Sequence, residues 1–176
     1  IQIFSTENTS SLVHGSGAIE TAYLQTVEAY KEYFSHLKPD GILHINYRIY
    51  PRMVNTAALA WKEMGFSDFQ KHVVVFEHSD DQMLLPTFLV KMNPWKEEEI
   101  EELNRLFSMV SPPGHEKTSK LVEDPIHPEK SFLSANFYSG NFPYSLARGM
   151  DFFIAPTTDH QPYFNFLRKN IAVLTP

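Results

Sequence analysis

The feature that most constrains this chain is a sharp turn, Lys38-Pro39-Asp40-Gly41, placed between a helical pattern and an apolar run. Pro39 cannot continue a helix, and Gly41 can adopt the positive φ that a tight turn needs. Apolar residues recur at helical spacing before the turn, and residues 42–47 are mostly apolar after it. A helix that returns at once to a buried strand is half of an α/β unit, so the turn predicts an α/β fold.

Four apolar runs are predicted to form strands, and they are residues 1–5, 41–47, 72–77 and 84–91. Only a short polar turn separates the last two, which should therefore pair antiparallel. The helical segments between the earlier strands predict parallel pairing with right-handed crossovers. The chain should thus form an open sheet that ends in an antiparallel hairpin.

Three helices are predicted, each with a recognisable boundary. Their boundary residues are Thr26 as a cap inside the first helix (residues 18–37), Pro51 and Gly65 at the two ends of the second, and Asn93 and Pro94 at the start of the third. We interpret residues 1–108 as one half-domain. Residues 109–130 are rich in Pro and polar side chains, and residues 109–176 are expected to form an irregular extension with short helices that packs on it.

Composition excludes several classes of protein. Asp and Glu outnumber Lys and Arg by 21 to 15, and the basic residues are scattered, so nucleic acid is not an expected partner. The chain has no cysteine, which excludes disulfides and thiolate metal sites and is compatible with a cytoplasmic domain. The histidines lack metal-ligand spacing, so no metal site is predicted. No apolar run approaches the roughly 20 residues of a membrane span.

Two segments carry a family resemblance. Residues 23–48, YLQTVEAYKEYFSHLKPDGILHINYR, resemble a segment of spermidine synthase-like proteins in which a Tyr-x-x-Thr-x-Glu-Ala-aromatic helix leads to Leu-Lys-Pro-(Asp/Gly)-Gly-(Ile/Val)-Leu. Residues 155–167, APTTDHQPYFNFL, resemble the Thr-Asp-Asp-Arg-Pro-aromatic segment that closes bacterial members in which such a domain is joined to membrane helices. His160 and Gln161 stand where Asp and Arg are more usual.

The matching positions of the two segments are Tyr23, Thr26, Glu28, Ala29, Tyr30, Leu37, Lys38, Pro39, Gly41 and Leu43, followed by Thr158, Asp159, Pro162, Tyr163, Phe164 and Phe166. The resemblance implies the C-terminal half of a Rossmann-like methyltransferase sheet. Strands four to seven of that fold would be residues 1–5, 41–47, 72–77 and 84–91. Its seventh strand inserts antiparallel between the fifth and the sixth.

The resemblance also implies a cofactor, S-adenosylmethionine or its decarboxylated form. The glycine-rich loop that binds this cofactor in the family has no counterpart here, and Ile1 opens the chain inside an apolar run without an initiator Met. We therefore expect the cofactor site in a preceding half-domain. The fragment alone is expected to bind no cofactor and to be inactive.

The activity implied is transfer of a methyl or aminopropyl group to a small amine or related acceptor. Family aminopropyltransferases carry Asp-x-x-Asp-Pro after strand four, where one Asp removes a proton from the attacking amine. Residues 4–9 read FSTENT instead, which argues against classical spermidine synthesis. Glu7 is the candidate surrogate base, and the alternative is a solvated loop carboxylate. The candidate substrate-binding residues are Ser5, Asn8, His14, Tyr23, Asn46 and Arg48.

A second hypothesis gives the chain no catalytic role. It would be a degenerate transferase fold that serves as a binding or scaffold module of a larger, membrane-attached protein on the cytoplasmic side. In either case, residues 1–5 would lose their usual neighbouring strand and become an exposed edge. Because exposed edges recruit other chains, a homodimer through this strand is expected.

Overall fold

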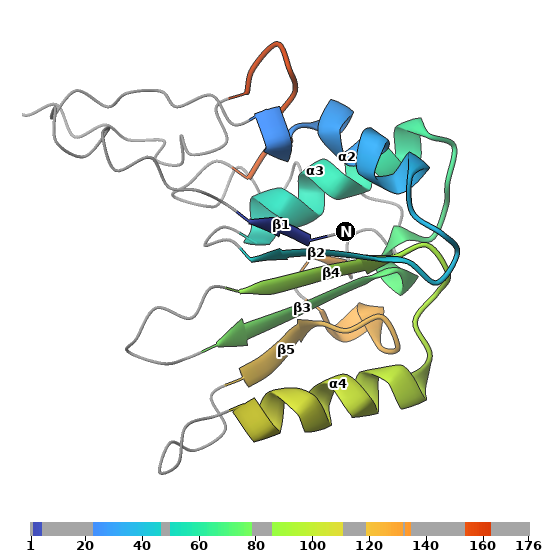
Figure 1. Ribbon diagram of the computed structural model, residues 1–176, viewed down its shortest axis with the longest axis vertical. Coiled ribbons are helices and arrows are strands. Elements are labelled where there is room, and N and C mark those ends of the chain that lie inside the picture. The colour runs from blue at the N-terminus through green and yellow to red at the C-terminus, as the bar shows by residue number, and fades with distance from the viewer. Residues whose placement is uncertain are drawn as a thin grey trace, which may run out of the picture.

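The computed structural model describes residues 2–4, 23–46, 50–78, 86–110, 119–131, 133–134 and 154–162. These residues form an α/β structure with one mixed sheet and helices on both of its faces (Figure 1). The strands are β1 (Gln2–Phe4), β2 (Ile42–Asn46), β3 (Val73–His78), β4 (Thr87–Lys91) and β5 (Ser119–Glu123). The helices are η1 (Tyr23–Gln25), α2 (Val27–Ser35), α3 (Tyr50–Glu63), η2 (Phe69–Lys71), α4 (Glu97–Val110) and η3 (Pro128–Lys130).

The strand order in the sheet is β1-β2-β4-β3-β5. β1 and β2 pair in parallel, and β4 lies between β2 and β3, antiparallel to both. The predicted antiparallel pairing of the last hairpin is therefore confirmed, although its second strand begins at Thr87. β5 adds to the other side of β3, also antiparallel. The prediction that residues 109–130 are irregular is wrong at this point, because β5 falls inside that polar stretch.

The predicted break in the first helix is confirmed. Thr26 is the N-cap of α2, and its hydroxyl accepts a hydrogen bond from the Ala29 amide. The turn that follows α2 requires glycine, because a Cβ on Gly41 would lie 2.9 Å from the backbone oxygen of Lys38. A side chain at position 41 would force the backbone of this turn apart. Glycine allows the close approach to Lys38, so the chain can turn tightly and enter β2 directly from the helix.

The other predicted helix boundaries have different outcomes. Gly65 adopts a φ of 82° just after α3, as a helix-ending glycine should. The predicted start at Asn93 is wrong, because α4 begins at Glu97. The Asn93 amide instead donates to the Pro39 carbonyl, and its side chain donates to Asp40. A contact with the distant 39–40 turn has replaced the local cap that the sequence pattern predicts.

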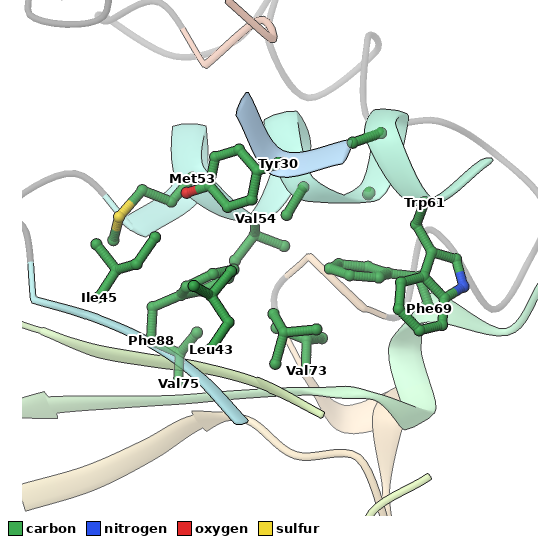
Figure 2. Close-up of a cluster of buried hydrophobic side chains, with 14 of the residues drawn as sticks. Tyr30, Leu43, Ile45, Met53, Val54, Trp61, Phe69, Val73, Val75 and Phe88 are labelled. Carbon is green, nitrogen blue, oxygen red and sulfur yellow. The ribbon is translucent and has the colours of Figure 1, made fainter. Parts of the chain in front are cut away.

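The main core lies between the sheet and helices α2 and α3 (Figure 1). Figure 2 shows Tyr30 of α2, with Met53, Val54 and Trp61 of α3, above the sheet residues. The sheet contributes Leu43, Ile45, Val73, Val75, Phe88 and Val90 to the cluster. Such close packing of aromatic and branched side chains fixes α3 over the strands.

A smaller cluster lies on the opposite face of the sheet, under α4. Val74, Phe76 and Leu89 pack there against Trp95 and Ile100. Within the described part of the chain, no helix is both long and apolar enough to cross a membrane.

Candidate functional site

The carboxyl ends of β1 and β2 meet the start of β4 at one edge of the sheet. Phe4 is registered against Asn46, and Asn46 is registered against Thr87. Ligands of open α/β sheets bind beyond the carboxyl ends of the strands, which is the edge meant here. We therefore take it as the candidate site and locate the predicted site residues relative to it.

Two of the predicted site residues can be placed. Asn46 is half-buried at the end of β2, and its side-chain nitrogen donates to the Thr87 hydroxyl at 3.1 Å. Tyr23 begins η1 and is 57% exposed, so its ring is open to a ligand. The other predicted site residues, Ser5, Glu7, Asn8, His14 and Arg48, lie outside the described residues.

His44 is on the same face of β2 as Asn46, two residues earlier. It is half-buried, and its Nε2 has no hydrogen-bond partner within the described ranges. Burial lowers the pKa of His44, although a hydrogen bond with the Asn46 side chain opposes this effect. The imidazole is thus neutral at physiological pH.

Two acids, Glu77 of β3 and Glu123 of β5, lie near each other where these two strands pair. Glu123 is fully buried, and its two carboxylate oxygens accept the backbone amides of Leu133 and Ser134, each at 2.9 Å. Burial raises the pKa of Glu123 despite these hydrogen bonds, and the nearby charge of Glu77 raises it further. These contacts also join β5 to residues 133–134.

Tyr50, the first residue of α3, belongs to the same electrostatic environment. Burial raises the pKa of its phenol, and the charges of Glu77 and Glu123 add to the rise. Neither acid forms an ion pair with any other described residue. The group therefore has net negative charge and a carboxyl whose pKa is raised, properties that suit proton transfer or attraction of a cation.

Sequence reasoning missed this group. Tyr50, Glu77 and Glu123 are far apart in the chain, and Glu123 belongs to a stretch that we predicted to be irregular. Only the antiparallel pairing of β5 with β3 brings the two acids near each other, because it sets Glu123 opposite Val75, two residues before Glu77. No local spacing signals such an arrangement.

A nine-residue segment, residues 154–162, lies across α2 and α3, and we call it the strap. Two α3 side chains hold its beginning: Asn55 donates to the Ile154 carbonyl at 2.7 Å, and Arg52 Nε donates to the Ala155 carbonyl at 3.0 Å. Arg52 is buried, which lowers its pKa to about 10, so the guanidinium stays charged at neutral pH. The strap therefore covers a buried cation near the start of α3.

Thr157 joins the strap to both helices. Its carbonyl accepts the Val27 amide at 2.8 Å, and its hydroxyl donates to the Gln25 carbonyl at 2.5 Å. Its own amide donates to the Thr56 hydroxyl of α3. Thr157 is buried, so these hydrogen bonds satisfy polar groups that would otherwise be costly to remove from water.

Asp159 completes the attachment at the start of α2. One of its carboxylate oxygens accepts the Thr26 hydroxyl at 2.7 Å, and its amide donates to the Glu28 carboxylate at 3.0 Å. The two segments that carry the family resemblance, residues 23–48 and 155–167, are thus in direct contact. This contact joins positions more than 130 residues apart in the chain.

Among the described residues, no group of three or more His, Asp or Glu side chains is arranged to hold a metal ion. Comparison with models of protein families, with curated proteins and with solved structures gives no match.

Proposed function

We propose that this chain is the C-terminal half of a Rossmann-like, S-adenosylmethionine-dependent transferase domain of the spermidine synthase-like type. The observation that carries the proposal is the order of the strands: β4 lies antiparallel between β2 and β3, and β1 pairs parallel to β2. Numbered as strands four, five, seven and six, these four strands have the order and directions that the resemblance implies.

The contact between the two resembling segments supports the same proposal. Thr26 and Glu28 in the first segment both bind Asp159 of the second. In this proposal, these positions match the family because they form one structural unit. Two unrelated chance resemblances would not be expected to meet in space.

The reaction proposed is transfer of a methyl or aminopropyl group to a small amine. Such an acceptor is a cation at neutral pH, and Glu77 contributes negative charge near the carboxyl end of β3. The amine must lose a proton before it attacks, and Glu7 is the proposed base. The cofactor, S-adenosylmethionine or its decarboxylated form, would bind in a preceding half-domain, and the protein would act in the cytoplasm.

Calorimetry on the longer protein tests this proposal. Saturable binding of either cofactor, followed by transfer of its labelled group to putrescine, is the expected result. If neither cofactor binds, the transferase proposal is wrong. The second candidate function, a scaffold module of the same fold, is favoured by the absence of Asp-x-x-Asp-Pro at residues 4–9, and it predicts that lack of binding.

The proposed homodimer through β1 has its own test. β1 is the last strand on its side of the described sheet, where it pairs only with β2. Light scattering of this chain should give the mass of a dimer. A proline in place of Ile3 should reduce it to a monomer, because proline removes a backbone donor from the strand. A monomeric wild-type chain contradicts this proposal.

A further inference from the structure

The hydroxyl of Thr26 has three neighbours and one proton to donate. It accepts the Ala29 amide, and it lies 2.7 Å from the Asp159 carboxylate and 3.0 Å from the Tyr23 carbonyl. A hydrogen bond to a charged carboxylate is stronger than one to a neutral carbonyl, and it is also the shorter of the two here. The proton therefore goes to Asp159, and Asp159 orients the hydroxyl that caps α2.

We propose that Asp159 is a positioning residue for the acceptor side of the transferase, an inference that rests on the proposed function. Tyr23 and Leu24 are the exposed residues of η1, the turn that ends just before the cap Thr26. Asp159 holds that turn through Thr26 and Glu28, while Thr157 holds the next residue, Val27. The strap also anchors the end of η1, where the Thr157 hydroxyl donates to the Gln25 carbonyl, and so positions the turn that carries Tyr23.

This role predicts a specific kinetic pattern in the longer, cofactor-binding protein, with putrescine as the acceptor. The substitution Asp159→Asn removes the charge but keeps the shape. It should raise the KM for putrescine about tenfold, the scale of one charge-assisted hydrogen bond, and leave kcat and the cofactor Kd unchanged. Thr26→Val should act in the same way, and Thr26→Ser, which keeps the hydroxyl, should behave as the wild type.

Hydrogen exchange provides a readout that does not depend on activity. The amides of Val27 and Ala29 are held by the strap and by the cap, so both should exchange faster in Asp159→Asn and in Thr26→Val. Faster exchange together with the KM increase supports the positioning role. An unchanged KM in a protein that transfers normally overturns this role, whether or not exchange changes. A wild-type protein that transfers from neither cofactor overturns the proposed function, and with it the role of Asp159.

Discussion

Lys91 of β4 and Glu99 of α4 form an ion pair, with Nζ 2.5 Å from the carboxylate, although Lys91 is only 4% exposed. The same ammonium lies over the Trp95 ring, 5.4 Å from its centroid. Removal of Glu99 leaves the buried ammonium with a weaker partner, the exposed carboxylate of Asp40 at 3.9 Å, whereas replacement of the cation by an apolar side chain leaves no buried charge.

We therefore expect two substitutions at this pair to differ in how much they lower the free energy of unfolding. Glu99→Ala should lower the free energy of unfolding by about 3 kcal/mol, the low end of the cost of removing one partner of a buried ion pair, because Asp40 still faces the ammonium. Lys91→Met should change it by less than about 1 kcal/mol, because methionine fills a similar volume. Urea denaturation measures both. A larger loss from Lys91→Met than from Glu99→Ala would contradict this account.

His72 should make stability dependent on pH. Burial lowers its pKa, even though its Nδ1 bonds the Lys91 carbonyl. A lowered pKa means that the folded state resists protonation. The contribution of neutral His72 to the free energy of unfolding is therefore complete above the unfolded pKa of about 6.5, and it is lost as the pH falls below that value.

The measurement is the free energy of unfolding between pH 7.5 and 5. In His72→Gln the decrease over this range should be smaller than in the wild type, and the readout is the slope rather than the absolute stability. His36→Gln is the matched control, because His36 is exposed at the end of α2. Equal slopes in all three proteins would show that His72 does not contribute.

Glu77 and Glu123 should repel each other at neutral pH. The raised pKa of Glu123 has burial as its main cause and the charge of Glu77 as a minor one. A raised carboxyl pKa contributes stability below the unfolded value, and this contribution is lost as the pH rises through the folded pKa. Glu77→Gln should therefore increase stability at pH 7 by about 0.5 kcal/mol.

The increase from Glu77→Gln should be much smaller at pH 4 than at pH 7, because Glu123, whose pKa is raised, then carries a proton and no longer repels Glu77. Thermal unfolding at the two pH values measures it. Glu97→Gln is the control, because Glu97 is an exposed acid on α4. A gain that is the same at both pH values would rule out charge repulsion as its cause.

Leu133 tests whether residues beyond 108 belong to the main core. Its side chain is fully buried in the cluster under α2 and α3. Leu133→Ala should cost about 2–5 kcal/mol of stability through the cavity it leaves. Leu106→Ala, at an exposed position of α4, should cost less than about 0.5 kcal/mol. Similar costs at both positions would place Leu133 outside the cooperative unit.

Glu7 is predicted to be the base of the proposed reaction. Glu7→Gln should lower kcat for transfer to putrescine about 10²–10⁴-fold, the usual contribution of a general base. Cofactor affinity should stay the same, because the substitution removes only the proton acceptor. Glu101→Gln, an exposed change on α4, is the control. Unchanged transfer in Glu7→Gln would assign Glu7 to a solvated loop.

Local chemistry was enough to predict much of the fold from the sequence. The cap at Thr26, the turn at Gly41 and the end of α3 at Gly65 depend on the conformations open to one or two residues. The strands β2, β3 and β4 were found within a few residues of their observed bounds, because each is a buried apolar run. The family resemblance then predicted where β4 lies in the sheet.

Only the tertiary structure decided the remaining features. β5 is a polar strand that is stabilised by its pairing with β3, so periodicity could not reveal it. Burial of Glu123 and the hydrogen bond between Asp159 and Thr26 depend on segments that meet only after folding. Patterns along a sequence report the preferences of neighbouring residues. The pKa of a carboxyl and the position of a helix start depend on whatever the rest of the chain places beside them.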